Sequence, residues 1–211
     1  MPGNHDAYAL GALGRGVSSW APWLGDSTDA SGLGAPDFPV RWRRGTIDFI
    51  GVSTAVATPP LMASGRIGSG QMARLRKLLN DAAEAGQIRV ILMHHPPDAG
   101  AEPWRKSLRD AGALRALLRE TGAELILHGH SHIRRRSSVA GPDGEIPVLG
   151  AGSASAAGRR KEPGHYHRLT LDIDDMQAVL QIEHRIYDAG TGVYKDGGGE
   201  TLPLPCGGQG A

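Results

Sequence analysis

The chain has 211 residues, a length that suits one ordinary domain. Hydrophobic residues make up 40% and charged residues 21%, so wholesale disorder is excluded. The formal net charge of +1 provides no broad positive field, which argues against nucleic acid as a partner. The longest uncharged run, Phe49 to Gly65, contains two prolines and is too short to span a bilayer, so we expect no membrane partner.

The amino terminus and the cysteine content both bear on location. The first residues, Met-Pro-Gly-Asn-His-Asp, place an acid where a secretory leader needs positive charge. The one cysteine, Cys206, cannot form a disulfide within the chain and stands in a Gly/Pro-rich segment, where we assign it no role. We therefore expect a cytoplasmic protein.

Two amphipathic helices and two buried strands alternate through the middle of the chain. The pattern predicts a helix at 69–86, a strand at 88–93, a helix at 107–122 and a strand at 124–128. Ser107 followed by Asp110 has the spacing of a capping box and predicts where the second helix begins. A strand, a helix and a strand in this order form a βαβ unit, whose strands are parallel and share one carboxyl edge.

The remaining segments divide into further strands and loops. We expect an extended pair within 40–54, strands at 146–149 and 166–173, and, from a more ambiguous pattern, a strand at 177–187. Segments 13–39 and 99–103 are typical of loops. Glycines accumulate after Gly190, so we expect one domain over 1–188 and a disordered tail over 189–211.

Six of the nine histidines fall in three short segments, and two of these segments follow the predicted parallel strands. His94 and His95 end the first strand, and His130 and His132 lie just after the second. Parallel strands bring these residues to one sheet edge, where open α/β sheets bind ligands. The other three histidines, at 165, 167 and 184, are isolated in the sequence, and we interpret them as ordinary surface or strand residues.

The clustered side chains are metal ligands by type. Imidazoles at His94, His130 and His132 suit Zn, Mn, Fe or Ni, and Asn4 adds a carbonyl oxygen. Other metal and nucleophile patterns are absent from the sequence: it has no His-Glu-x-x-His motif, and no Gly-x-Ser-x-Gly between a strand and a helix. A metal site is therefore the leading interpretation of the cluster.

Three segments, Pro-Gly-Asn-His-Asp at 2–6, Met-His-His-Pro-Pro at 93–97 and His-Gly-His-Ser-His at 128–132, resemble the last three motifs of the calcineurin-like metallophosphoesterases. The resemblance implies a layered α/β/β/α sandwich. It also implies a role for each matching residue: Asn4, His94 and His130 would hold one metal ion, His132 would help to hold a second, and His5 would be a general acid held by Asp6. His95 would only flank the site, because the family's ligand stands two positions before the proline.

The implied function is metal-dependent hydrolysis of small phosphate mono- or diesters by a metal-bridging hydroxide, in a dinuclear centre of divalent ions. The His-His-Pro-Pro form is most similar to the class III cyclic-nucleotide phosphodiesterase branch. We interpret the arginines at 134–136 as a solvated basic loop rather than as substrate contacts. The oligomeric state is left open.

The family's Asp-x-His and Gly-Asp motifs should precede Asn4, yet only three residues do. The resemblance therefore implies an N-terminally truncated fold that holds at most one ion well. A start codon further upstream is the favoured explanation, ahead of a true truncation and of a partner chain that completes the site. The alternative function is an inactive or single-metal-binding fragment.

Overall fold

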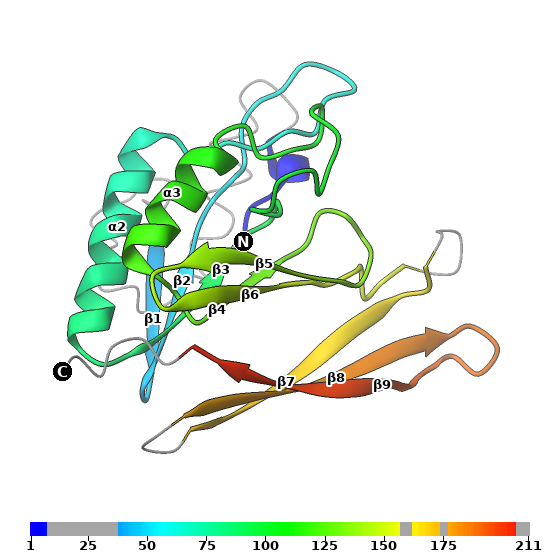
Figure 1. The fold of residues 1–211 in the computed structure, drawn as a ribbon. Coiled ribbons are helices and arrows are strands. Elements are labelled where there is room, and N and C mark those ends of the chain that lie inside the picture. The colour runs from blue at the N-terminus through cyan, green and yellow to red at the C-terminus, as the bar shows by residue number, and fades with distance from the viewer. Residues whose placement is uncertain (8–37, 157–161, 174–176, 206–211) are drawn as a thin grey trace.

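The computed structural model describes residues 1–7, 38–156, 162–173 and 177–205, which form two sheets and two α-helices (Figure 1). The elements are η1 (Asn4–Asp6), β1 (Val40–Arg44), β2 (Ile47–Gly51), α2 (Ser69–Glu84), β3 (Ile88–Leu92), α3 (Ala111–Thr121), β4 (Leu125–His128), β5 (Arg135–Gly141), β6 (Gly144–Gly150), β7 (His165–Ile173), β8 (Ala178–Asp188) and β9 (Val193–Leu204). The first sheet has the order β1-β2-β3-β4-β6-β5, and the second has the order β7-β8-β9.

The centre of the six-stranded sheet is parallel, as the sequence predicts. β2, β3, β4 and β6 pair in parallel, while β1 and β5 are antiparallel strands at the two edges. Helix α3 connects β3 to β4 and completes the expected βαβ unit. The loops that follow β3 and β4 therefore leave the sheet at the same edge.

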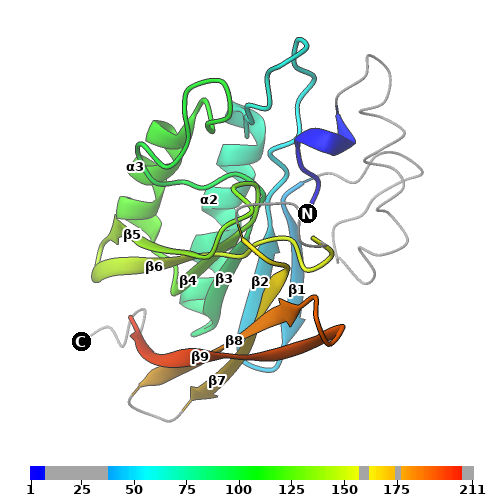
Figure 2. The same cartoon turned by 90° about the vertical axis from the view of Figure 1, so that its right-hand side faces the viewer.

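The six-stranded sheet is buried on both faces, which explains its continuous apolar strands. Because side chains alternate along a strand, Ile91 and Ile126 pack under the helices, while Val90 and Leu125 face the three-stranded sheet. Figure 2 shows α2 and α3 on one side of this sheet and β7, β8 and β9 on the other. The chain thus has a mixed α/β fold whose described residues form three layers, α/β/β, of the predicted sandwich.

Helix α3 begins four residues later than predicted. Ser107 donates its hydroxyl to the Trp104 carbonyl and caps no helix, and Asp110 makes no side-chain hydrogen bond to its own helix. Instead, the Asp110 carboxylate accepts hydrogen bonds from the backbone amides of Ile67 (3.0 Å) and Gly68 (2.8 Å). The predicted capping box is therefore wrong, because Asp110 links the start of α3 to the start of α2.

The predicted disordered tail is wrong for most of its length. Strand β9 covers Val193–Leu204 and pairs with β8 along its whole length, with Leu204 buried against the first sheet's core. The glycines in β9 permit close packing: a Cβ at Gly197 would lie 2.6 Å from the Ile186 side chain, and one at Gly199 would lie 2.4 Å from a backbone oxygen. The rest of the tail, 206–211, lies outside the described residues, as does nearly all of the predicted loop at 13–39.

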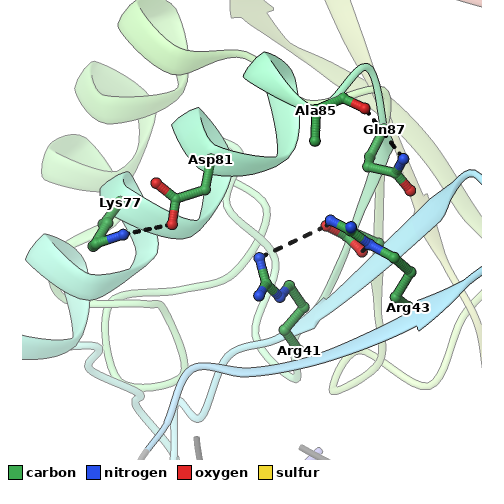
Figure 3. Close-up of polar contacts among 7 residues, drawn as sticks. Arg41, Arg43, Lys77, Asp81, Ala85 and Gln87 are labelled. Atoms are coloured by element: carbon green, nitrogen blue, oxygen red, sulfur yellow. Dashed lines mark hydrogen bonds and ion pairs between the residues drawn. The ribbon is translucent and has the colours of Figure 1, made fainter. Parts of the chain in front are cut away.

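Ion pairs fix the β1 edge of the sheet. Asp48 is completely buried, and its two carboxylate oxygens accept hydrogen bonds from Arg43 at 2.8 Å each. Arg41 approaches the same carboxylate at 4.0 Å, and Lys77 pairs with Asp81 along α2 (Figure 3). A buried carboxylate that loses its partner costs about 3–5 kcal/mol, so Arg43 is a structural residue.

Candidate metal centre

Three of the predicted site residues meet at the carboxyl edge of the parallel strands. His94 lies two residues after β3, His130 lies two residues after β4, and Asn4 opens the short helix η1. The Asn4 Oδ1 atom lies 2.9 Å from His94 Nε2 and 3.2 Å from His130 Nδ1. The two ring nitrogens are themselves 3.2 Å apart. Segments that are far apart in the sequence thus bring three donor atoms to one point.

The size of this donor triangle fits one face of a metal site. Ligand bonds of about 2.1 Å place neighbouring donor atoms about 3.0 Å apart at right angles and about 3.4 Å apart in a tetrahedron. Two of the observed edges, at 3.2 Å, lie in that range, and the third, at 2.9 Å, lies at its lower end. The residues therefore fit one divalent ion, with two nitrogen donors and one oxygen donor.

The same donor set contains no negatively charged ligand. Among the described residues, no group of three or more histidine, cysteine, aspartate or glutamate side chains is placed to hold a metal ion. The triangle contains two histidines, and its third donor is a neutral amide. The geometry supports a single site with three neutral ligands.

The electrostatics keep the imidazoles neutral. Burial above all, together with the nearby His95, His130, amino terminus and His132, lowers the pKa of His94 to about 3. Burial also lowers the pKa of His130, an effect that the Glu102 charge and a backbone hydrogen bond at Lys106 partly oppose. Because a metal binds the neutral ring, these shifts favour ligand function near neutral pH.

The turn that carries His130 and His132 has an unusual backbone. Both residues have left-handed conformations, with φ angles of 67° and 56°. Such conformations cost on the order of 1–3 kcal/mol each and cluster at functional sites. Two hydrogen bonds hold the turn. The Gly129 amide donates to the His94 carbonyl at 3.1 Å, and the Ser131 hydroxyl donates to the Glu102 carboxylate at 2.5 Å. His132 lies close enough that its charge would lower the pKa of both His94 and His130.

Gly3 is needed for space beside His94. Its φ of −122° and ψ of −171° are extended angles that any residue adopts. A Cβ at this position, however, would lie 2.6 Å from the His94 ring. The absence of a side chain therefore lets η1 approach the ring and place Asn4 against it.

His95 is a supporting residue that the sequence analysis treated only as a flanking position. Its side chain is completely buried, with ring centroid 4.2 Å from that of His130. His95 Nε2 donates to the Ala63 carbonyl (2.9 Å), so its Nδ1 accepts from the Thr54 hydroxyl (2.7 Å). These two bonds fix the ring against which His130 packs. The doubled histidine was the available signal, but only the structure shows that Thr54 anchors it.

His5 and Asp6 lie beside the donor triangle on η1. The His5 side chain is exposed to solvent, as a proton donor to a substrate must be. The Asp6 carboxylate accepts the Gly3 amide proton at 2.8 Å and closes the turn that carries Asn4 and His5. Their predicted roles as general acid and its partner stay predictions.

The basic residues outside the site were only partly predicted. Arg134 lies in the expected exposed loop, whereas Arg135 and Arg136 belong to β5. Arg135 pairs with Asp98 at 3.1 Å, and Arg136 pairs with Glu200. The histidines at 165, 167 and 184 are strand residues, as expected, and β7 and β8 bring them together.

Within the described part of the chain, no helix is long and apolar enough to cross a membrane.

Comparison with known proteins places the chain in a family. A search of the curated proteins found no match. The sequence profile of the calcineurin-like phosphoesterases matches residues 1–134, a span that includes Asn4, His94, His130 and His132. The chain therefore belongs to the calcineurin-like phosphoesterase family.

Proposed function

We propose that this protein hydrolyses small phosphate mono- or diesters with the help of divalent metal ions. Membership of the family implies a phosphoesterase of this general kind. The observation that carries the proposal is the triangle of Asn4 Oδ1, His94 Nε2 and His130 Nδ1, because its edges of 2.9–3.2 Å match a metal-binding face.

The proposed roles follow the geometry. Asn4, His94 and His130 would hold one ion, and His132, on the same strained turn, would help to hold a second. A donor set rich in imidazole suits Mn, Fe, Zn or Ni. When bound, such ions neutralise charge on the phosphoryl oxygens and lower the pKa of water.

His5 is the proposed general acid. It is exposed and adjacent in sequence to Asn4 on η1, the short helix that carries one corner of the donor triangle. A histidine gives up a proton readily near neutral pH, and the leaving alkoxide needs one. Asp6 holds the turn closed through the Gly3 amide, which keeps His5 and Asn4 in a fixed relation.

Within the family, we favour a phosphodiester substrate of the cyclic-nucleotide type. The support is the His-His-Pro-Pro segment at 94–97, in which His94 joins the donor triangle and His95 supports it. We propose that this doubled histidine distinguishes the branch.

The test is hydrolysis of bis(p-nitrophenyl) phosphate by the protein purified from its native source, with Mn²⁺ added and with the metal removed by a chelator. We expect turnover that depends on the metal and that His94→Ala or His130→Ala each abolishes. Turnover that survives chelation, or that either variant retains, would contradict the proposal. Arg119→Gln, an exposed change on α3 far from the triangle in sequence, is the control and should turn over normally.

A single-metal-binding protein without turnover is the second candidate. The observation in its favour is that the donor triangle contains no carboxylate, and that no larger group of acidic and histidine ligands occurs among the described residues. It predicts stoichiometric metal binding with no turnover at any metal concentration. Metal-dependent turnover would eliminate it.

A further inference from the structure

A groove between the two sheets is lined by arginine and histidine side chains that the proposed reaction does not use. It consists of two cavities, of about 240 and about 420 Å³. Arg134 and His184 line both cavities, so they form the boundary between them. The larger cavity also contacts His167, and the smaller one contacts Glu162.

Hydrogen bonds fix which nitrogen of His184 is available. His167 Nε2 donates to the Gly150 carbonyl at 3.1 Å, so in the neutral ring its Nδ1 carries a lone pair. That lone pair accepts the Nδ1 proton of His184 at 2.9 Å. The ring of His184 is therefore held by one nitrogen, and its Nε2 has no hydrogen-bond partner among the residues that the structure describes. In the neutral ring this Nε2 atom carries a lone pair, so it binds a ligand in the groove by accepting a proton from it.

Arg134 is the arginine of this segment whose charge is not neutralised by an ion pair. Arg135 pairs with Asp98, and Arg136 pairs with Glu200. The Arg134 guanidinium forms no ion pair within the described ranges, although its backbone amide donates to Glu162 at 3.1 Å. Burial lowers the pKa of both His167 and His184, and the Arg134 charge adds to the lowering. The groove therefore presents a guanidinium and a directed imidazole side by side.

The groove adjoins the candidate metal centre through the chain itself. Arg134 follows His132 by two residues, so their Cα atoms are at most about 7 Å apart. The groove therefore begins a short stretch of chain away from the candidate metal centre. A guanidinium donates charge-assisted hydrogen bonds to phosphate oxygens, and the lone pair of a neutral imidazole accepts the proton of a monoprotonated phosphate.

We propose that Arg134 and His184 bind a second phosphate group of the substrate, one that is not hydrolysed. The preferred substrates are then phosphate esters that carry a further phosphate on the leaving or retained group. This proposal rests on the proposed function, since it assumes that the scissile phosphate lies at Asn4, His94 and His130.

Binding is tested first, without turnover. Inorganic phosphate is titrated into the metal-free protein while the imidazole signals are followed by NMR. We expect the His184 signals to shift and saturate in the wild type and to stay unshifted in Arg134→Gln. The Arg119→Gln variant, which changes an exposed arginine on α3 outside the groove, should behave as the wild type does. Unshifted His184 signals in the wild type, or equal shifts in Arg134→Gln, would overturn the proposal.

Kinetics then test the substrate class. Two substrates are compared, the p-nitrophenyl phosphodiester of thymidine with and without a second phosphate on the sugar. Loss of a charge-assisted contact should raise KM for the doubly phosphorylated substrate about tenfold in Arg134→Gln, with kcat unchanged. The KM for the singly phosphorylated substrate should stay constant.

The two proposals fail in different ways. An Arg134→Gln variant that changes both KM values equally would overturn the groove proposal and leave the proposed function intact. If neither substrate is hydrolysed, the proposed function fails, and with it the substrate class. The NMR titration would still decide whether the groove binds phosphate.

Discussion

Two groups of histidines occupy this fold, and they use the same ring in opposite ways. In the first, His94 and His130 direct ring nitrogens at the Asn4 oxygen, with the three atoms 2.9–3.2 Å apart. In the second, His167 and His184 bond to each other at 2.9 Å, and His167 also bonds to the Gly150 carbonyl. The first arrangement converges on a point that an ion can occupy. The second joins the Nδ1 atoms of its two rings to each other, so these atoms are not directed at a common third point.

The difference between the two groups comes from where the strands place the histidine rings. His94 and His130 follow parallel strands, so they leave one sheet edge together and meet η1. His167 and His184 face each other across an antiparallel pair, in direct register within β7 and β8. Cross-strand partners lie close enough to bond directly. Proximity of histidines therefore does not by itself make a metal site.

The largest expected effect separates the two groups by metal affinity. His94→Ala or His130→Ala removes a donor from the triangle, and each should weaken Mn²⁺ binding by about a hundredfold or more. His184→Gln, a change in the second group, should leave the affinity unaltered. Isothermal titration calorimetry measures all three, and similar losses in every variant would contradict the contrast.

A substitution outside the rings should also disrupt the first group. In Gly3→Ala, the new Cβ would lie 2.6 Å from the His94 ring and push Asn4 away from it. We expect Mn²⁺ affinity to fall about 10–100-fold, the usual range when the support of a ligand is lost. The matched control is Gly70→Ala on α2, where the nearest atom is the flexible end of Arg74 at 3.7 Å. Equal affinity in the two variants would show that η1 does not position Asn4.

Removing the hydrogen bond that holds His95 should have a smaller effect on metal affinity. Thr54→Val keeps the shape of the side chain but removes the hydroxyl that bonds to His95 Nδ1 at 2.7 Å. The His95 ring then loses one of its two fixed contacts, and His130 loses a rigid neighbour 4.2 Å away. We expect Mn²⁺ affinity to fall about tenfold in Thr54→Val and to be restored in Thr54→Ser. Equal affinities in the valine and serine variants would remove His95 from the account.

The pH dependence of stability tests the His95 ring through a different quantity, the free energy of unfolding. Burial and the nearby His130 lower the pKa of His95 to about 4, while the unfolded residue keeps about 6.5. The unfolded chain therefore binds the extra proton between these values, so stability is full above pH 6.5 and falls as the pH drops toward 4. The shift corresponds to on the order of 3 kcal/mol.

Urea unfolding of the metal-free chain between pH 7 and pH 4 measures this loss. The free energy of unfolding should fall less steeply with decreasing pH in His95→Gln than in the wild type, because the titrating ring is gone. An identical slope in the two proteins would show that His95 does not contribute.

The sequence predicted the parts of the fold whose signals are local. Alternating helices and apolar strands placed α2, β3 and β4 correctly, and the parallel pairing of β3 with β4 followed from their order. The convergence of His94 and His130 followed from that pairing. The motif segments led to the family that the profile match over residues 1–134 shows.

The parts that were missed depend on contacts between distant residues. Glycines at 197 and 199 indicated a flexible tail, but their lack of side chains permits β9 to pack closely on β8. Asp110 had the spacing of a local cap, yet its carboxylate bonds to amides 42 and 43 residues away in the chain. Thr54 carried no signal at all, because its role exists only where it meets His95.

The central claim is that Asn4, His94 and His130 form one face of a divalent metal site. Pulsed EPR of the protein with one equivalent of Mn²⁺ tests it directly, because couplings to ring nitrogens report bound imidazoles. The account predicts couplings from two histidine nitrogens, of which one disappears in His94→Ala and the other in His130→Ala. A spectrum without nitrogen couplings, or one that both variants leave unchanged, would contradict it.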